Sequence, residues 1–264
     1  FLSVDEFGRV DPVEVKESIR PDTAVVSIIY ANNEIGTINP ISEIAAICHE
    51  KGVLFHTDAV QAAAHIKLDL KQTPIDLLAV GAHKFYGPKG VGCLVVRNGT
   101  KLLPIITGGS HEFGLRAGTP NVPYIVGLAE ALKLTVSELD ARTEILRSLR
   151  DRLILGVLNT IPRSKLTGHP DDRLPNHASF VFEGVDVNLL LMMLDMAGFA
   201  CSSGSACKVG EPKPSEVLSA IGLSKNWSMG SLRVTLGKNT IADDIEQLLL
   251  SLPGLIDQIR KSKL

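Results

Sequence analysis

The sequence predicts an α/β protein with a mostly parallel sheet in its first half and a smaller α+β unit in its second half. In the first half, short β-branched runs alternate with amphipathic helical segments, which is the pattern of βαβ units. Further strand and helix patterns follow a glycine- and threonine-rich segment at 107–119. We therefore expect two domains, residues 1–122 and 123–264.

The composition is that of a globular protein. Of the 264 residues, 45% are hydrophobic and 21% are charged. The apolar runs are too short for a membrane span, and a net charge of −2 without a Lys/Arg block gives no reason to expect nucleic acid. Four cysteines do not make a disulfide framework in a chain of this size. A reducing compartment is favoured, so we expect the cytoplasm, with an organelle as the alternative.

Each element of the first half has a local signal. Asp11–Pro12 begins a helix, with Asp11 as its N-cap, and 24–30 has the pattern of a buried strand. From Ile41, apolar residues recur at the i, i+3, i+4, i+7 spacing of one helix face. Cys48 is on that face and is predicted to be core, while Gly52 suits the C-terminal cap.

Polar side chains follow two of the predicted strands. Strand 53–57 leads to Asp58, and strand 76–80 leads to His83 and Lys84. In open α/β sheets, ligands bind outside the carboxyl ends of the strands. We expect these side chains to lie at one edge of the sheet and to belong to a site.

The remaining elements are predicted in order. A strand at 90–97 is followed by a long helix from Asn121. The second domain then has a strand at 178–183, a helix at 187–197, a strand at 231–236 and a closing helix from Ile241.

Glycines and a proline in 81–90 force a tight loop around Lys84. A lysine partly shielded from water in such a loop suits Schiff-base chemistry, and the alternative is a surface lysine in a turn. Asp58, at the end of its strand, suits a protonated pyridine nitrogen, which makes the ring an electron sink. Its alternatives are an N-cap for the next residues or a metal ligand with His56, although one His-x-Asp pair is a weak metal signal.

Segment 201–207 consists of small residues between two cysteines, which predicts a mobile loop with the Cys207 thiol as a nucleophile. The alternatives are a metal half-site with Cys201, or two ordinary buried cysteines. Arg233 is within the apolar strand 231–236 and requires a partner there. That partner is either a substrate carboxylate or a structural salt bridge.

Together these segments resemble the cysteine desulfurases, a branch of the fold-type I pyridoxal-phosphate enzymes related to the class V aminotransferases. The resemblance runs along nearly the whole chain. It is carried by motifs that occur in the family's order at 31–37, 56–61, 82–90, 108–109, 115–119, 202–207 and 231–237. The resemblance implies a PLP-dependent transferase fold of type I, with a partial large domain and a smaller C-terminal domain.

The resemblance implies a role for each cofactor-binding residue. Lys84 matches the lysine that holds pyridoxal 5′-phosphate covalently, and Asp58 matches the partner of the pyridine nitrogen. Asn33 and Gln61 match contacts to the phenolic oxygen, and His83 matches a phosphate contact.

It also implies an activity and partners. Thr119 matches a residue that reaches the phosphate of the other subunit, which implies a homodimer. Arg233, with Asn33, matches the binding site of the L-cysteine carboxylate. Cys207 matches the cysteine that takes the sulfur as a persulfide, leaving L-alanine, and passes it to an iron–sulfur scaffold or a tRNA-thiolation protein.

Two departures from the family pattern bear on activity. Gly81 stands where many relatives carry a serine that contacts the phosphate. The chain opens on Phe1 without Met, and about a third of a typical family member has no counterpart before it, so a truncated chain with little or no activity of its own is expected. The alternatives are a selenocysteine lyase or aminotransferase-like enzyme, which would depend less on Cys207, and a non-catalytic fragment that binds sulfur-transfer partners.

Overall fold

The computed structural model describes residues 1–204 and 215–262, and the chain forms two compact units. Unit 1 consists of residues 1–14, 31–39 and 140–264, and unit 2 of residues 15–30 and 40–139. These compact units do not coincide with the predicted domains 1–122 and 123–264, because residues 123–139 pack with unit 2. The domain boundary after residue 122 stays a prediction.

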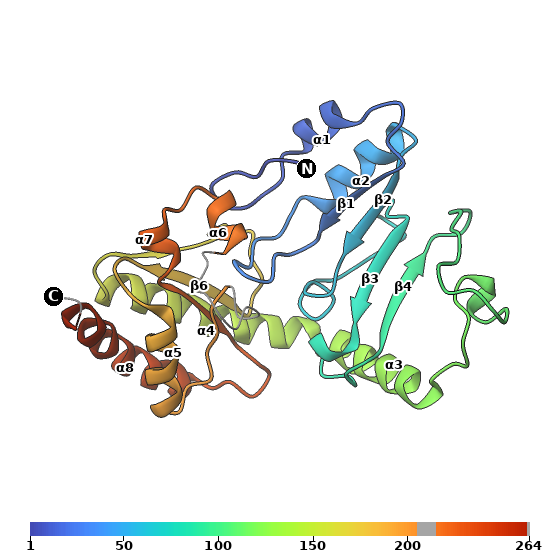
Figure 1. Ribbon diagram of the computed structural model, residues 1–264. Coiled ribbons are helices and arrows are strands. Elements are labelled where there is room, and N and C mark those ends of the chain that lie inside the picture. The colour runs from blue at the N-terminus through green and yellow to red at the C-terminus, as the bar shows by residue number, and fades with distance from the viewer. Residues whose placement is uncertain (205–214, 263–264) are drawn as a thin grey trace. The chain divides into compact units, whose positions relative to one another are not determined.

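The sheet of unit 2 has four strands in the order β1-β2-β3-β4 (Figure 1). Its strands are β1 (Val25–Ile29), β2 (Leu54–Asp58), β3 (Leu77–Gly81) and β4 (Gly92–Val96). The first three are parallel, and β4 is antiparallel to β3. The prediction of a mostly parallel sheet is confirmed.

The prediction that β1 is buried is wrong. Of its five residues only Ile28 is buried, and Val25 is 47% exposed. The reason is the position of β1 at the edge of the sheet, where β2 is its single neighbour among the described strands. An apolar run does not distinguish a central strand from an edge strand, because the two differ in their neighbours and not in their sequence.

The two helices predicted in this region are confirmed. The helix α1 (Pro12–Ser18) begins where Asp11 Oδ1 accepts a hydrogen bond from Val13 N at 2.8 Å. The helix α2 (Ile41–Glu50) buries the four residues of its predicted face, Cys48 included. Burial and the charge of Asp76 raise the pKa of Cys48 to about 11, so this thiol is inert core.

The loop that carries Lys84 is held in place by the apolar packing of its buried residues. After β3 the chain turns through η1 (Ala82–Lys84), whose Ala82 and Phe85 are fully buried. The helix α3 (Val122–Ser137) packs its Leu128 and Leu132 against them. A second short turn, η2 (Glu112–Gly114), precedes α3.

Unit 1 is built on a three-stranded antiparallel sheet in the order β5-β6-β7. The strands are β5 (Ser164–Leu166), β6 (His177–Phe182) and β7 (Ser231–Thr235), and the helices are α4 (Leu139–Thr160), α5 (Val187–Met196), α6 (Glu216–Ala220), α7 (Lys225–Ser228) and α8 (Ala242–Lys261). All six residues of the central β6 are buried, and α4, α5 and α8 supply most of the remaining core. The short elements β5, α6 and α7 were not predicted.

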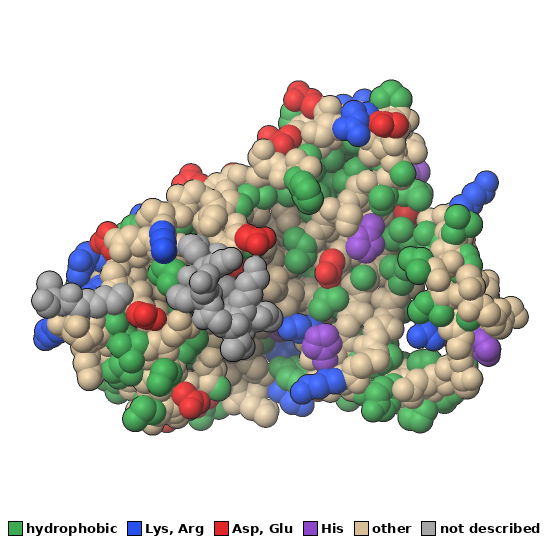
Figure 2. All heavy atoms as spheres, viewed as in Figure 1, with side chains coloured by type: hydrophobic (Ala, Val, Ile, Leu, Met, Phe, Trp, Pro, Cys, Tyr) green, Lys and Arg blue, Asp and Glu red, His purple; other side chains and the backbone are tan. Residues whose placement is uncertain are grey.

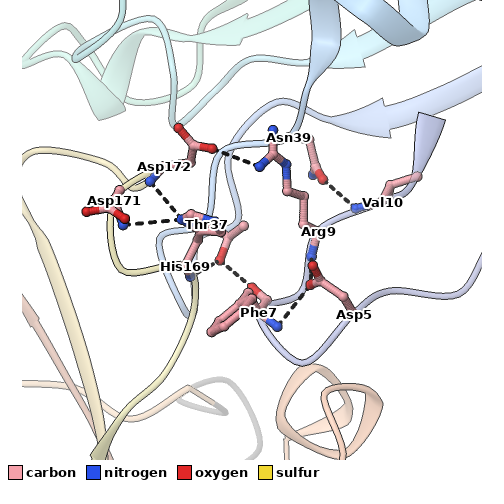
Figure 3. Close-up of polar contacts among 9 residues, drawn as sticks. All are labelled: Asp5, Phe7, Arg9, Val10, Thr37, Asn39, His169, Asp171 and Asp172. Atoms are coloured by element: carbon pink, nitrogen blue, oxygen red, sulfur yellow. Dashed lines mark hydrogen bonds and ion pairs between the residues drawn. The ribbon is translucent and has the colours of Figure 1, made fainter.

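Polar contacts join the N-terminal segment to segments 31–39 and 169–172 within unit 1 (Figure 3). Thr37 Oγ1 donates to the Phe7 carbonyl at 2.5 Å and accepts from His169 N at 2.9 Å. Arg9 forms an ion pair with Asp172 at 2.8 Å. Thr37, which follows the turn at 32–36, is therefore held by contacts with two segments distant in sequence.

We expect Gly168→Ala to destabilise unit 1 far more than Gly184→Ala. Both glycines have positive φ, +79° and +73°, so alanine costs roughly 1 kcal/mol in backbone strain at either position. A Cβ at Gly168 would also lie 2.2 Å from the Ile35 carbonyl oxygen, whereas nothing lies within 4 Å at Gly184. Overpacking adds about 1–3 kcal/mol. Urea denaturation of both variants measures the difference, and equal losses would contradict the close packing.

Among the described residues, every helix is too short or too polar to cross a membrane.

Candidate active site

The residues expected at the sheet edge of unit 2 do lie at one edge. Asp58 is the last residue of β2 and pairs with Ala79 of β3, and Ala59 N donates to the Ala79 carbonyl at 2.9 Å. Because η1 follows β3 directly, His83 and Lys84 leave the sheet on the same side as Asp58. Figure 2 shows acidic and histidine side chains over this part of the sheet.

Asp58 is held in place by the turn that follows it. It is half-buried, and its Oδ1 accepts a hydrogen bond from Val60 N at 2.9 Å. The residues that follow form a turn and not a helix, so this contact is not the helix N-cap that one alternative predicted. It does not exhaust the side chain, because an ionised carboxylate has about four acceptor positions.

The metal alternative has no support from the described residues, where no group of three His, Cys, Asp or Glu is suited to a metal ion. His56 Nδ1 lies 2.8 Å from Ser27 Oγ instead.

A side chain at Gly81 would lie close to His83. A Cβ there would lie 3.2 Å from His83 Cε1 and 3.6 Å from Val60 Cγ1, so the imidazole lies over the position that a larger side chain would use. His83 therefore occupies the space beside the departure from the family pattern. Lys84 is exposed within unit 2, so the partial shielding from water that we expected is not found there.

The other two predicted cofactor contacts of unit 2 are Gln61 and Thr119. Gln61 is half-buried in the turn after Asp58. Thr119 is exposed in the segment that leads into α3, next to Gly118 with φ +114°. Thr119 is thus accessible but is not fixed by packing in unit 2.

In unit 1, Arg233 is held by neutral oxygen atoms. Its Nη1 donates to the Asn33 carbonyl at 3.0 Å, and its Nη2 donates to Ser202 Oγ at 3.3 Å. The backbones of Arg233 and Ser202 exchange two hydrogen bonds, of 2.7 and 3.2 Å. Among the residues that the structure describes, Arg233 forms no ion pair, so the salt-bridge alternative finds no partner there. The guanidinium is oriented and still carries its charge.

The Asn33 carbonyl that receives Arg233 is fixed by a tight turn. Asn32 Oδ1 accepts hydrogen bonds from Glu34 N at 2.8 Å and Ile35 N at 3.1 Å, and Gly36 N donates to the Asn32 carbonyl. Gly36 has φ +78°, and a Cβ there would lie 2.7 Å from His177 Nδ1.

His177, which the sequence analysis missed, supports the same carbonyl. It is 2% exposed, and its Nε2 lies 3.2 Å from the Asn33 carbonyl oxygen, which can only accept. Burial, with the nearby charge of Arg173, lowers the pKa of His177 to about 3. The ring is therefore neutral with its proton on Nε2. Nothing in the sequence distinguishes this histidine from any other at the start of a strand.

Glu34 is a second residue that the sequence analysis missed. Its Oε2 accepts a hydrogen bond from Ser215 Oγ at 2.5 Å. Burial raises the pKa of Glu34, while the Ser215 hydrogen bond and the charge of Arg233 act in the opposite direction. A signal was present, because Glu34 follows Asn33 within the motif at 31–37.

Cys207 lies outside the described residues, so its predicted role as a nucleophile and the predicted mobility of its loop are not tested. Cys201 is half-buried against the core of unit 1, and burial raises its pKa to about 11. It is a protonated thiol and a poor nucleophile.

The fold belongs to a known structural class. A solved NifS-like protein superposes with a TM-score of 0.89 at 33% identity, covering 98% of this chain and 68% of that one. The structure of SspA in complex with cysteine matches with a TM-score of 0.75 at 31% identity, covering 91% of this chain and 67% of that one. The predicted α/β fold of the type I pyridoxal-phosphate enzymes is confirmed.

Residues 1–248 match the aminotransferase class-V family, and the chain belongs to that family. Among curated relatives, the cysteine desulfurase IscS of Methanosarcina thermophila is 45% identical over 260 residues. The alignment covers 98% of this chain and 64% of the relative, so the chain spans less than two thirds of that protein's length. The predicted resemblance to the cysteine desulfurases is confirmed.

Proposed function

We propose that the protein is a pyridoxal 5′-phosphate-dependent cysteine desulfurase, which converts L-cysteine to L-alanine and takes the sulfur as a persulfide on Cys207. The observation that carries the proposal is the register of β2 and β3, because it brings Asp58 and Lys84 to one sheet edge. Its relatives named as cysteine desulfurases, and the cysteine in the complex of SspA, support the choice of substrate.

The side chains at the sheet edge of unit 2 fit the cofactor. A carboxylate fixed by the backbone suits the pyridine nitrogen, an exposed primary amine suits the aldehyde, and an imidazole suits the phosphate. We assign these roles to Asp58, Lys84 and His83. Gln61 and Asn33 are assigned to the phenolic oxygen, and Thr119 to the phosphate of a second subunit in a homodimer. When bound, pyridoxal phosphate supplies an electron sink for the amino-acid carbon.

The chain's own residues would then bind the substrate and move protons and sulfur. Arg233 binds the carboxylate of L-cysteine, and Lys84 moves the proton at its α-carbon. The thiolate of Cys207 attacks the substrate sulfur, so that a sulfur–sulfur bond forms as the carbon–sulfur bond breaks. The carbon keeps the electron pair and takes up one proton, which balances the proton that Cys207 lost. The products are L-alanine and a persulfide.

The persulfide requires an acceptor, for which we propose a sulfur-carrying protein such as an iron–sulfur scaffold. We place this exchange in the cytoplasm, where free thiols such as Cys48 and Cys93 persist.

Arg233→Lys is expected to raise the KM for L-cysteine by roughly 10- to 100-fold with a smaller change in kcat. Lysine cannot keep the two donors to Asn33 and Ser202 while it also binds a carboxylate, and a charge-assisted contact contributes about 1.5–3 kcal/mol. Steady-state kinetics test this, with Arg152→Lys as the control, since Arg152 forms an exposed ion pair with Glu246. A change confined to kcat would argue against carboxylate binding.

The central test measures L-alanine formed from L-cysteine by the protein with added pyridoxal phosphate, in the wild type, Cys207→Ala and Cys93→Ala. We expect Cys207→Ala to lose activity. Cys93→Ala should keep it, since Cys93 is an exposed residue of β4. Alanine formation from L-selenocysteine that survives Cys207→Ala would favour the selenocysteine lyase. Failure to take up the cofactor, with retained binding of a scaffold protein, would favour the non-catalytic fragment.

A further inference from the structure

One carboxylate touches both ends of the segment that contains Cys207. Gly204 and Ser215 are the last and first described residues on either side of 205–214. A Cβ at Gly204 would lie 2.6 Å from Glu34 Oε2 and 3.6 Å from Ser215 Cβ. The same Oε2 accepts the hydrogen bond from Ser215 Oγ at 2.5 Å. The two stems are thus side by side, and Glu34 lies against both.

Each stem is also tied to rigid structure. Ser202, two residues before Gly204, is paired with Arg233 of β7. On the other side, Ser215 is the N-cap of α6, and its Oγ accepts from Leu218 N at 3.3 Å. Leu218 packs with Ile35, the neighbour of Glu34, in one fully buried cluster. A displacement of Glu34 would therefore displace both Gly204 and Ser215.

The Ser215 hydroxyl donates its one hydrogen bond to Glu34 and accepts a hydrogen bond from Leu218 N of α6. An ionised carboxylate is the best acceptor for that proton, and hydrogen bonds to charged groups are about twice as strong as neutral ones. The charge of Arg233 favours the ionised form, whereas burial and the charge of Glu216 on α6 oppose it.

From this geometry we propose that Glu34 is a positioning residue that clamps Gly204 and Ser215, the two described residues that flank the segment with Cys207, and that sulfur transfer to Cys207 depends on this clamp. This inference rests on the proposed desulfurase function for its consequence, but the clamp itself is defined by described residues alone.

The clamp is tested without activity by hydrogen–deuterium exchange of peptides that cover 199–204 and 215–223. In Glu34→Ala both peptides should exchange at least about fivefold faster than in the wild type, because one group holds both. In Glu34→Gln, which keeps an acceptor oxygen, exchange should stay within about twofold. Glu50→Gln, on the exposed end of α2, is the matched control. Faster exchange in one peptide only, or in neither, would overturn the clamp.

The consequence is tested by the rate of persulfide formation on Cys207, followed by mass spectrometry, together with the KM for L-cysteine. Glu34→Ala should slow persulfide formation about tenfold with KM within about twofold, and Glu34→Gln should restore most of the rate. Unchanged persulfide formation in Glu34→Ala overturns the positioning role. Absence of persulfide in the wild type overturns desulfurase activity of this chain, and the exchange result then still decides the clamp.

Discussion

Alanine in place of Lys84 should end covalent capture of pyridoxal phosphate and lower L-alanine formation by about 1000-fold. The lysine amine is proposed both to hold the cofactor and to move a proton, and alanine can do neither. The fold should survive the change, because Ala82 and Phe85 make the buried contacts of this loop while Lys84 is exposed.

The measurement for Lys84 is borohydride reduction in the presence of pyridoxal phosphate, followed by mass spectrometry of the peptides. Wild type should carry the label at residue 84, and Lys84→Ala should carry none above background. Lys89→Ala changes an exposed lysine of the same loop and should keep both the label and the activity. Label spread over many surface lysines in wild type would contradict the assignment of this sheet edge as the cofactor site.

The second large effect is the contribution of His177 to the pH dependence of stability. Its pKa in the folded protein, about 3, is below the value of 6.5 expected for the unfolded chain. Between these values the unfolded chain binds a proton that the folded chain excludes. The stabilisation is therefore complete above about pH 6.5 and is lost as the pH falls toward 3, by about 1.4 kcal/mol per pH unit.

Urea denaturation at a series of pH values between 7 and 4 measures this effect in wild type and His177→Gln. Glutamine can donate to the Asn33 carbonyl but does not titrate. In the variant, the free energy of unfolding should therefore change with pH by about 1.4 kcal/mol per unit less than in the wild type. The difference in free energy of unfolding between the two proteins should shrink as the pH falls. His49→Gln, on the exposed face of α2, should follow the wild-type curve. Parallel curves for wild type and His177→Gln would show that the histidine is not held neutral.

Much of unit 2 could be predicted from the sequence because its signals are local. The buried face of α2 follows from apolar spacing, its end follows from Gly52, and the placement of Asp58 and Lys84 at one sheet edge follows from the order of the strands. The exposure of β1 could not be predicted, because burial of an apolar strand depends on which strands lie beside it. The exposure of Lys84 could not be predicted either, because it depends on which segments pack over its loop.

Unit 1 shows where local signals end. The sequence placed Arg233 on a strand and required a partner for it. Among the described residues its partners are Ser202 Oγ and the backbone carbonyl of Asn33, 200 positions away, and none of them is an acidic side chain. His177 and Ser215 carry no pattern of their own, and they matter because β6 and α6 bring them to the turn at 32–36.

The sequence by itself determined the fold class, the family and the residue types at the sheet edge that we propose for the cofactor, because these depend on periodicity and on motifs of fixed spacing. The tertiary structure alone decided which side chains are held, neutralised or left charged. Those properties come from burial and from contacts between segments distant in sequence, such as Glu34 with Ser215 and His177 with Asn33. Hydrogen bonding and desolvation act over a few ångströms in space, and the separation of two residues along the chain does not set that distance.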